Sequence, residues 1–274
     1  MEIEELIRIP AALPSIPRVI ALLLNELNTD EPSLQKINSL LSEDPVMTAR
    51  LLRLANSARF QLSRTISSAS EAIAILGTSE VREVALSAAL ASVFNRVGGV
   101  YMVQFWRYSL NTAKLTRALY GLMPRNNVNP YTLGLIHAVG ELVMHLGMPE
   151  QTALLDSKVE IFSPARARAE IDEFGYSYAQ VGAAFAREWG LPDEMAQLLE
   201  RLDNPYNLDQ IDSQAAILHL AVWRCRAEEC EYTLSDLLMS FPDDVAAAVK
   251  LDLPKVLERE PIQWTSLQEA GLFS

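Results

Sequence analysis

Three side chains that could bind a metal ion follow one another at helical spacing in LGLIHAVGELVMHLG, residues 133–147. They are His137, Glu141 and His145, which we expect to lie on one helix. Side chains at positions i and i+4 can share a metal, as in the H-E-x-x-H helix. The first and third residues, however, lie about 12 Å apart along the axis, too far for one ion. At most His137 and Glu141 could cooperate, with ligands from other helices; otherwise these are polar residues at the edge of a helical core.

Other catalytic motifs are missing from the sequence. It contains no G-x-S-x-G elbow, no P-loop and no G-x-G-x-x-G after a strand. Cys225 and Cys230 form neither a disulfide framework nor a zinc site, which needs about four ligands. The residues alone therefore predict no nucleophilic catalysis.

The rest of the chain reads as a series of helices. Asp44-Pro45 is an N-cap followed by proline in the first turn, and Gly77 should end the short helix SEAIAILG before TSEVREVALSAALASVF begins. We expect PYTLGLIHAVGELVMHLG to be one helix that ends at Gly147, and the tail from Asp243 to be one helix with an irregular end. No segment alternates like a strand over any useful length, so the predicted fold class is all-α, an irregular multi-helix bundle.

The glycine pair Gly98-Gly99 is the predicted boundary between two lobes, because it separates two long helical segments. We predict an N-terminal helical lobe at residues 1–97 and a second helical lobe at residues 100–220. Residues 221–274 should form an acidic helical extension packed on the same unit.

Composition and charge limit the classes of function. Hydrophobic residues make up 50% of the 274, enough for a sizeable core. The net charge of −12 comes mainly from residues 200–274, which hold 14 acidic and 6 basic residues, and it disfavours binding to nucleic acid. The start, MEIEELIRIP, has no signal-peptide core, and no apolar run reaches the roughly 18 residues of a membrane helix. We therefore expect a cytoplasmic protein without membrane contact.

One segment is basic although the chain as a whole is acidic. Residues 45–70 contain four arginines and no acidic residue. Asn56 and Ser57 follow the last apolar positions of the expected helix, where asparagine can cap the helix in the left-handed conformation. The alternative is a surface that presents guanidinium groups to a carboxylate or phosphate of a partner. The residues of this predicted interaction surface are Arg50, Arg53, Asn56, Ser57, Arg59 and Arg64.

Several segments together resemble the HDOD domain, the HD-related output domain of bacterial signalling proteins. LPSIPRVIALLLNEL is similar to its L-P-x-x-P entry, and SEDPVMTARLLRLANSARF to its D-P-x-L core with the N-S pair. SSASEAIAILG, WRYSLNTA, GLIHAVGELVM and FGYSYAQVGAAFAREWGLP then match later motifs in the same order. The resemblance covers roughly residues 13–220 and implies a helical fold in two lobes, the C-terminal one resembling the HD phosphohydrolases.

The HD phosphohydrolases hold metal through a histidine, a His-Asp pair and a further aspartate, and this chain departs from that set. The His-Asp pair is His137-Ala138, Tyr108-Ser109 stands near the place of the earlier histidine, and Tyr178 replaces another. A lysine common after the glycine of the His-Asp motif is here Glu141. One imidazole without an aspartate cannot offset the desolvation of divalent ions. The resemblance thus implies a degenerate pocket, which consists of Tyr108, Ser109, His137, Glu141 and Tyr178, without metal or other cofactor.

The sequence therefore predicts a non-catalytic signal-transduction module, not an enzyme. It should act by binding a signalling protein, or a small ligand in the degenerate pocket. The alternative is a residual metal-dependent phosphohydrolase that acts on a nucleotide or cyclic dinucleotide and needs a divalent ion near His137. The identity of the partner and the oligomeric state, including a homodimer, stay open.

Overall fold

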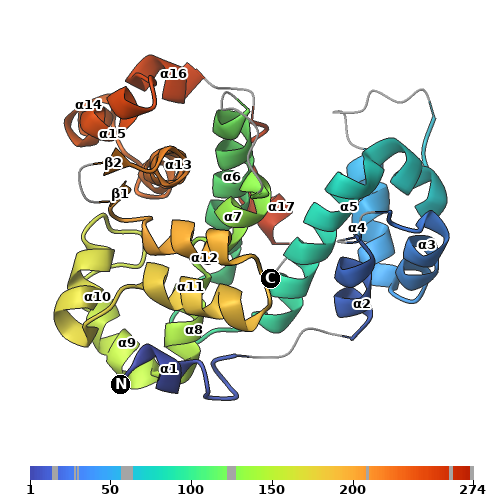
Figure 1. Cartoon of the computed structure of the whole chain (residues 1–274), viewed down its shortest axis with the longest axis horizontal. Coiled ribbons are helices and arrows are strands. Elements are labelled where there is room, and N and C mark those ends of the chain that lie inside the picture. Colours follow the sequence, from blue (N-terminus) through green and yellow to red (C-terminus); the bar gives the residue numbers. More distant parts are fainter. Residues whose placement is uncertain are drawn as a thin grey trace. The chain divides into compact units, whose positions relative to one another are not determined.

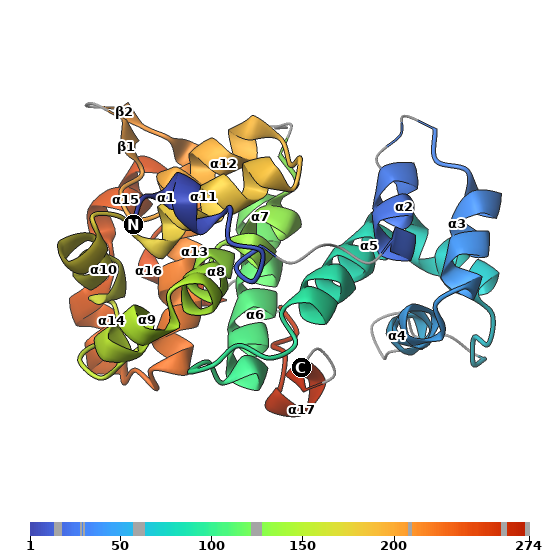
Figure 2. The same ribbon diagram turned by 90° about the horizontal axis from the view of Figure 1, so that it is seen from below.

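The computed structural model describes residues 1–13, 18–27, 29, 31–56, 64–121, 128–207, 210–258 and 262–271. The chain divides into two compact units: unit 1 contains Met1–Pro14 and Arg96–Leu272, and unit 2 contains Ser15–Asn95 (Figures 1 and 2). Among the described residues, we find no helix whose length and hydropathy would let it span a bilayer.

Unit 2 consists of four helices around one apolar cluster. They are α2 (Arg18–Leu27), α3 (Leu34–Ser42), α4 (Pro45–Ala55) and α5 (Ala69–Val93). The side chains of Leu23, Ile37 and Leu51 are among those that α2, α3 and α4 bury in this cluster. Asp44 accepts a hydrogen bond from the Met47 N–H at 3.0 Å, so the predicted N-cap of α4 is confirmed.

The predicted helix break at Gly77 is also confirmed. The helical path of α5 is interrupted there by backbone angles of φ 76° and ψ 165°. Only glycine adopts such a conformation without strain. The residue is therefore a backbone hinge between two helical segments.

Unit 1 is a larger assembly of helices, most of them short. In chain order they are α1 (Ile3–Leu6), α6 (Met102–Tyr120), α7 (Pro130–Ile136), α8 (Val139–Gly147), α9 (Pro149–Asp156), α10 (Arg166–Phe174), α11 (Tyr178–Glu188), α12 (Asp193–Glu200), α13 (Ser213–Glu229), α14 (Leu234–Ser240), α15 (Asp243–Ala248), α16 (Leu253–Glu258) and α17 (Leu267–Ala270). The long helices α6 and α13 pack against each other, and α11 lies between α8 and α12 (Figure 1). Two strands, β1 (Tyr206–Asn207) and β2 (Gln210–Ile211), form a short antiparallel pair between α12 and α13.

The N-terminal residues belong to unit 1, whereas the sequence predicts them in the first lobe. Helix α1 contacts α8 and α11. A Cβ at Gly147 would lie 2.2 Å from Leu6 Cδ1, so the glycine makes room for the α1 side chain. The predicted single tail helix is likewise wrong, because α15, α16 and α17 are separate short helices.

The expectation of one helix over residues 130–147 is wrong in an informative way. Helix α7 ends at Ile136 and α8 starts at Val139, with Ala138 in a non-helical conformation (φ −108°, ψ 6°). In a continuous helix the Ala138 N–H would bond to the Gly134 carbonyl. The His137 side chain takes that carbonyl instead, through Nδ1 at 2.7 Å. His137 therefore sits at the corner between two helices.

Two glycines let the helices around this corner approach closely. A Cβ at Gly134 of α7 would lie 2.7 Å from the Ala113 Cα of α6, and a Cβ at Gly140 of α8 would lie 1.9 Å from the Tyr178 carbonyl oxygen of α11. Real Cβ atoms do not come so near to backbone atoms. The glycines thus fix where His137 lies relative to α6 and α11.

Substitution of Gly140 should expose this constraint. Gly140→Ala forces α8 and α11 apart, and we expect it to lower the free energy of unfolding by about 1–3 kcal/mol. Gly182→Ala is the matched control on the opposite helix, because its Cβ meets only ordinary contacts of 3.6 Å or more. Urea denaturation of both variants checks the prediction, and equal stability of the two would contradict it.

Candidate functional site

His137 is fully buried and neutral at the corner between α7 and α8. Its Nδ1–H donates to the Gly134 carbonyl at 2.7 Å, which leaves a lone pair on Nε2. Nε2 is buried and has no hydrogen-bond partner among the described residues. Burial lowers the pKa of His137 to about 3. The ring therefore stays uncharged at physiological pH and is enclosed by protein.

Tyr108 of α6 covers the imidazole. The two rings meet edge to face, with centroids 4.7 Å apart, and Phe162 meets the other part of the Tyr108 ring at 5.2 Å. The pKa of Tyr108 is raised because the ring is buried, so its hydroxyl is a neutral phenol. An aromatic ring thus stands next to the histidine near the place where the resemblance expects a metal ligand.

Tyr178 is the first residue of α11 and bonds to a residue that sequence reasoning missed. Its hydroxyl accepts a hydrogen bond of 3.0 Å from Nη2 of Arg226, on α13. Burial raises the pKa of Tyr178 well above its ordinary value. The charge of Arg226 lowers the pKa of Tyr108 and Tyr178 against the larger, raising effect of burial, whereas at His137 burial and the charge of Arg226 both lower the pKa. The structure thus brings three of the five predicted pocket residues together around a guanidinium group.

Ser109 lies on α6 beside Tyr108 and is completely buried. Ser109, Thr112 and Thr116 share one face of α6 by their spacing, and Thr112 and Thr116 border Gly134 of α7. The three hydroxyl oxygens have no hydrogen-bond partner among the described residues. Ser109 is therefore part of a polar stripe between helices rather than a partner of His137.

Glu141, the fifth predicted pocket residue, lies in a different environment. Its carboxylate oxygens accept hydrogen bonds from Arg166 Nε at 3.2 Å and Nη2 at 3.1 Å. Arg166 also donates to Glu170 Oε1 at 2.7 Å and to Asp156 Oδ1 at 2.7 Å. Because Arg166 has no exposed surface, these groups form a buried ion cluster between α8, α9 and α10.

His145 joins the same ion cluster. Its Nδ1 lies 2.6 Å from the Glu141 carbonyl oxygen and its Nε2 lies 3.0 Å from Asp156 Oδ2. The segment that suggested a metal centre is thus divided: His137 faces aromatic rings, whereas Glu141 and His145 bind other charged groups.

The residues around His137 do not fit the metal ions that the fold family implies. A divalent ion needs ionised or lone-pair ligands held at about 2.0–2.2 Å. Tyr108 and Tyr178 are protonated, Ala138 offers no carboxylate, and the adjacent Arg226 repels cations. Within the described residues no group of three His, Cys, Asp or Glu side chains could hold a metal.

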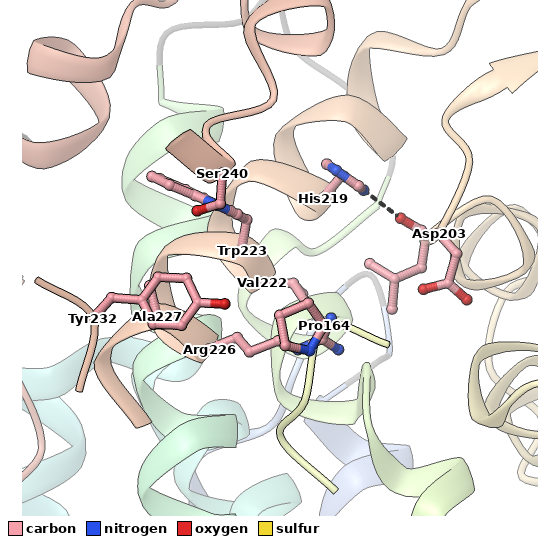
Figure 3. A pocket seen from close by; sticks show the side chains of 10 residues that line it. Pro164, Asp203, His219, Val222, Trp223, Arg226, Ala227, Tyr232 and Ser240 are labelled. Carbon is pink, nitrogen blue, oxygen red and sulfur yellow. Dashed lines mark hydrogen bonds between the residues drawn. The ribbon is translucent and has the colours of Figure 1, made fainter. Parts of the chain in front are cut away.

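A small cavity opens beside Arg226 in unit 1. It has a volume of about 200 Å³ and is lined mainly by α13, which contributes His219, Trp223 and Arg226, and by Asp203 after α12 (Figure 3). His219, Trp223 and Arg226 share one helix face at positions i, i+4 and i+7. This mixed polar and aromatic stripe in QAAILHLAVWRCRAEE is the sequence signal that could have identified the cavity.

The predicted interaction surface belongs to unit 2, and Ser57 and Arg59 lie outside the described residues. Asn56 does not adopt a left-handed conformation. Its side chain instead donates to the Leu52 and Ile66 carbonyls, both at 2.8 Å, and accepts from the Ile66 N–H. Arg64 pairs with Glu71 at 2.8 Å, Arg50 is partly buried, and Arg53 is exposed. Asn56 thus holds the backbone near Ile66, and Arg53 and Arg64 are the exposed arginines of this surface among the described residues.

The buried ion cluster should make stability depend on pH. Burial first, and then the charge of Glu170, raise the pKa of Glu141 well above 4.5, against the effect of Arg166. A carboxyl group whose pKa is higher in the folded than in the unfolded chain stabilises the folded chain. This contribution is complete when the pH lies below the unfolded-state pKa, and it is lost as the pH rises through the folded-state pKa. Glu141→Gln keeps a neutral side chain of the same shape and escapes this loss.

We therefore expect wild type to lose stability relative to Glu141→Gln as the pH rises above about 4.5 and through the raised pKa of Glu141, by at most about 1.4 kcal/mol per pH unit. Urea denaturation across this range measures the difference. Glu173→Gln is the control, because Glu173 is an exposed residue of α10 that pairs with Lys158 at 3.6 Å. Parallel stability curves for wild type and Glu141→Gln would show that the Glu141 carboxyl holds no extra proton.

Comparison with known proteins places this geometry in a family. The family model described as the HDOD domain matches residues 13–205. A proposed phosphohydrolase from Shewanella amazonensis has a similar fold, with a TM-score of 0.77, 23% identity and 98% of each chain covered. An HDOD domain protein of unknown function from Geobacter sulfurreducens is 25% identical, with a TM-score of 0.68 over 89% of this chain and 87% of its own.

A curated relative, an uncharacterized protein of Treponema pallidum, is 25% identical over 184 residues. These residues are 66% of this chain but 36% of the relative, so the chain spans little more than a third of that protein. The fold similarity confirms the predicted all-α, HD-like architecture. Since the family model covers most of the sequence in the order of the motifs, the chain belongs to the HDOD domain family.

Proposed function

We propose that this HDOD domain is a non-catalytic signal-output module that acts by binding a signalling protein. The observation that carries the proposal is the position of the Arg226 guanidinium. Its guanidinium bonds to Tyr178 and acts on Tyr108 and His137, near the positions where the resemblance expects metal ligands. A permanent cation at this point opposes the binding of divalent ions.

The state of His137 supports the same proposal. A general acid or base works best with a pKa near the working pH and within reach of the substrate. His137 is fully buried, and its pKa of about 3 is far from neutrality. The imidazole is therefore suited to packing against Tyr108 and not to proton transfer.

Hydrolysis is tested on the full chain with a nitrophenyl phosphodiester, a nucleotide and a cyclic dinucleotide, each with and without Mn²⁺. We expect turnover no higher than in buffer, and less than stoichiometric metal by elemental analysis, because the pocket lacks a ligand set. The control is His137→Ala, checked for folding by circular dichroism. Stoichiometric metal and activity that both disappear in His137→Ala would overturn the proposal in favour of a residual phosphohydrolase.

The partner-binding part of the proposal is tested at Arg53. This exposed residue lies in the last turn of α4, whereas Arg64, which is also exposed, pairs with Glu71. With the full chain as bait in an extract of its source cells, we expect Arg53→Glu to lower partner recovery severalfold. Arg18→Glu, an exposed charge reversal on α2, should leave recovery unchanged. Equal recovery with both variants would exclude Arg53 from the binding surface.

A further inference from the structure

The cavity beside Arg226 contains a buried cation that makes no close ion pair. Among the described residues no carboxylate lies within 4 Å of its guanidinium, and Nη2 donates a hydrogen bond to the Tyr178 hydroxyl. Nε is buried and unpaired. Tyr108 and Tyr178 are neutral phenols, and the charge of Asp203, which lines the same cavity, acts on the guanidinium without a direct contact. A buried guanidinium with an unpaired donor is stabilised when an anion binds it directly.

The other donors of the cavity are already used. Trp223 Nε1 donates to Ser240 Oγ at 3.2 Å, and the Ser240 hydroxyl donates to the Asp236 carbonyl at 2.7 Å. His219 Nδ1 donates to the Leu202 carbonyl at 2.8 Å. The Tyr232 hydroxyl points into the cavity (Figure 3). Arg226 and Tyr232 are thus the groups left to bind an anion, whereas the Trp223 ring and Val222 offer an apolar wall.

We propose that this cavity binds a small organic monoanion, a carboxylate with a compact apolar body, through Arg226. The inference rests on the proposed function, because a divalent metal at His137 would compete for the carboxylate. Planar carboxylates match the guanidinium group in shape and hydrogen bonding. The volume of about 200 Å³ limits the ligand to a small molecule.

The charge balance favours a carboxylate over a phosphate ester. Asp203 lies at the exposed side of the cavity, where its carboxylate accepts a hydrogen bond from Ser177 at 3.2 Å. One guanidinium and one carboxylate cannot compensate the double charge of a phosphate monoester. A monocarboxylate instead pairs with Arg226 and places its apolar part on Trp223 and Val222.

Tyr178 connects the Arg226 cavity with the helices of unit 1, so ligand binding at Arg226 can affect them. The Tyr178 hydroxyl accepts from Arg226, and the Tyr178 N–H donates to Glu170 Oε2 at 2.6 Å. One residue therefore connects the cavity with the ion cluster around Arg166. A carboxylate that draws the guanidinium toward the cavity changes the bond that holds the start of α11.

The test is isothermal titration calorimetry of the full chain with acetate, butyrate, benzoate and indole-3-acetate at constant ionic strength. We expect saturable one-to-one binding of at least one carboxylate. The matching primary amide of that carboxylate should bind at least about tenfold more weakly, because it lacks the charge. Inorganic phosphate should bind more weakly than the best carboxylate.

Three variants separate recognition from folding. Arg226→Gln should abolish binding and Arg226→Lys should restore part of it, with circular dichroism as the check on folding. Asp203→Asn keeps the acceptor for Ser177 and removes a negative charge, so it should tighten carboxylate binding severalfold. That gain is not expected from a merely structural role and stays informative if Arg226→Gln does not fold.

Several results would overturn the inference: no saturable binding by any carboxylate, tighter binding of phosphate, or no gain from Asp203→Asn. Failure here is distinguishable from failure of the proposed function. If the chain has no phosphodiesterase activity and Arg53→Glu lowers partner recovery, the proposed function stands. If that chain also binds no carboxylate, only the inference about the cavity fails. Metal-dependent hydrolysis would overturn the function itself.

Discussion

The ion cluster around Arg166 is the constraint on which the rest of unit 1 depends. Its members are three carboxyl groups, Glu141, Glu170 and Asp156, the guanidinium of Arg166 and the imidazole of His145. Burial raises the pKa of both Glu141 and Glu170, which favours a proton on this pair of carboxyl groups. Loss of one member leaves a buried charge without its partner, which typically costs about 3–5 kcal/mol. The cluster therefore fixes α8, α9 and α10 as one body.

Tyr178 is where this body meets the cavity. Its backbone bonds to Glu170 and its side chain bonds to Arg226, while Gly140 lets α8 approach its carbonyl group. The start of α11 thus has little freedom to move unless one of these contacts changes. The Arg226 contact is the one that borders a cavity. A change at the cavity can therefore alter α11 without breaking the ion cluster.

Local features of the fold could be predicted from the sequence because neighbouring residues determine them. The N-cap at Asp44 and the break at Gly77 follow from residue type alone. The break between α7 and α8 could not, because periodicity does not reveal that the His137 side chain competes for the Gly134 carbonyl. Asn56 was recognised as a residue near a helix end, but its bonds to Ile66 depend on a loop contact ten positions away.

The sequence shows which family residues are absent from the candidate site. It does not show which residues from distant parts of the chain contact that site. Ala138 shows directly that the carboxylate of the His-Asp pair is absent. Arg226 and Arg166, in contrast, reach Tyr178 and Glu141 across sequence separations of 48 and 25 residues, which no local pattern encodes. Glu141 departs from the family pattern that the resemblance implies, and its neighbours are those of the ion cluster.

Under the function that we propose, Arg226 in place of metal ligands reverses the charge of the ligand that the pocket binds. A metal site combines fixed anionic ligands with an exchangeable cation. Here the cation is covalently fixed on α13, and the nearby tyrosines and histidine are neutral. The charge that can enter and leave is then negative. A pocket of this kind suits reversible recognition, because an anion that binds one guanidinium dissociates without any bond to a metal being broken.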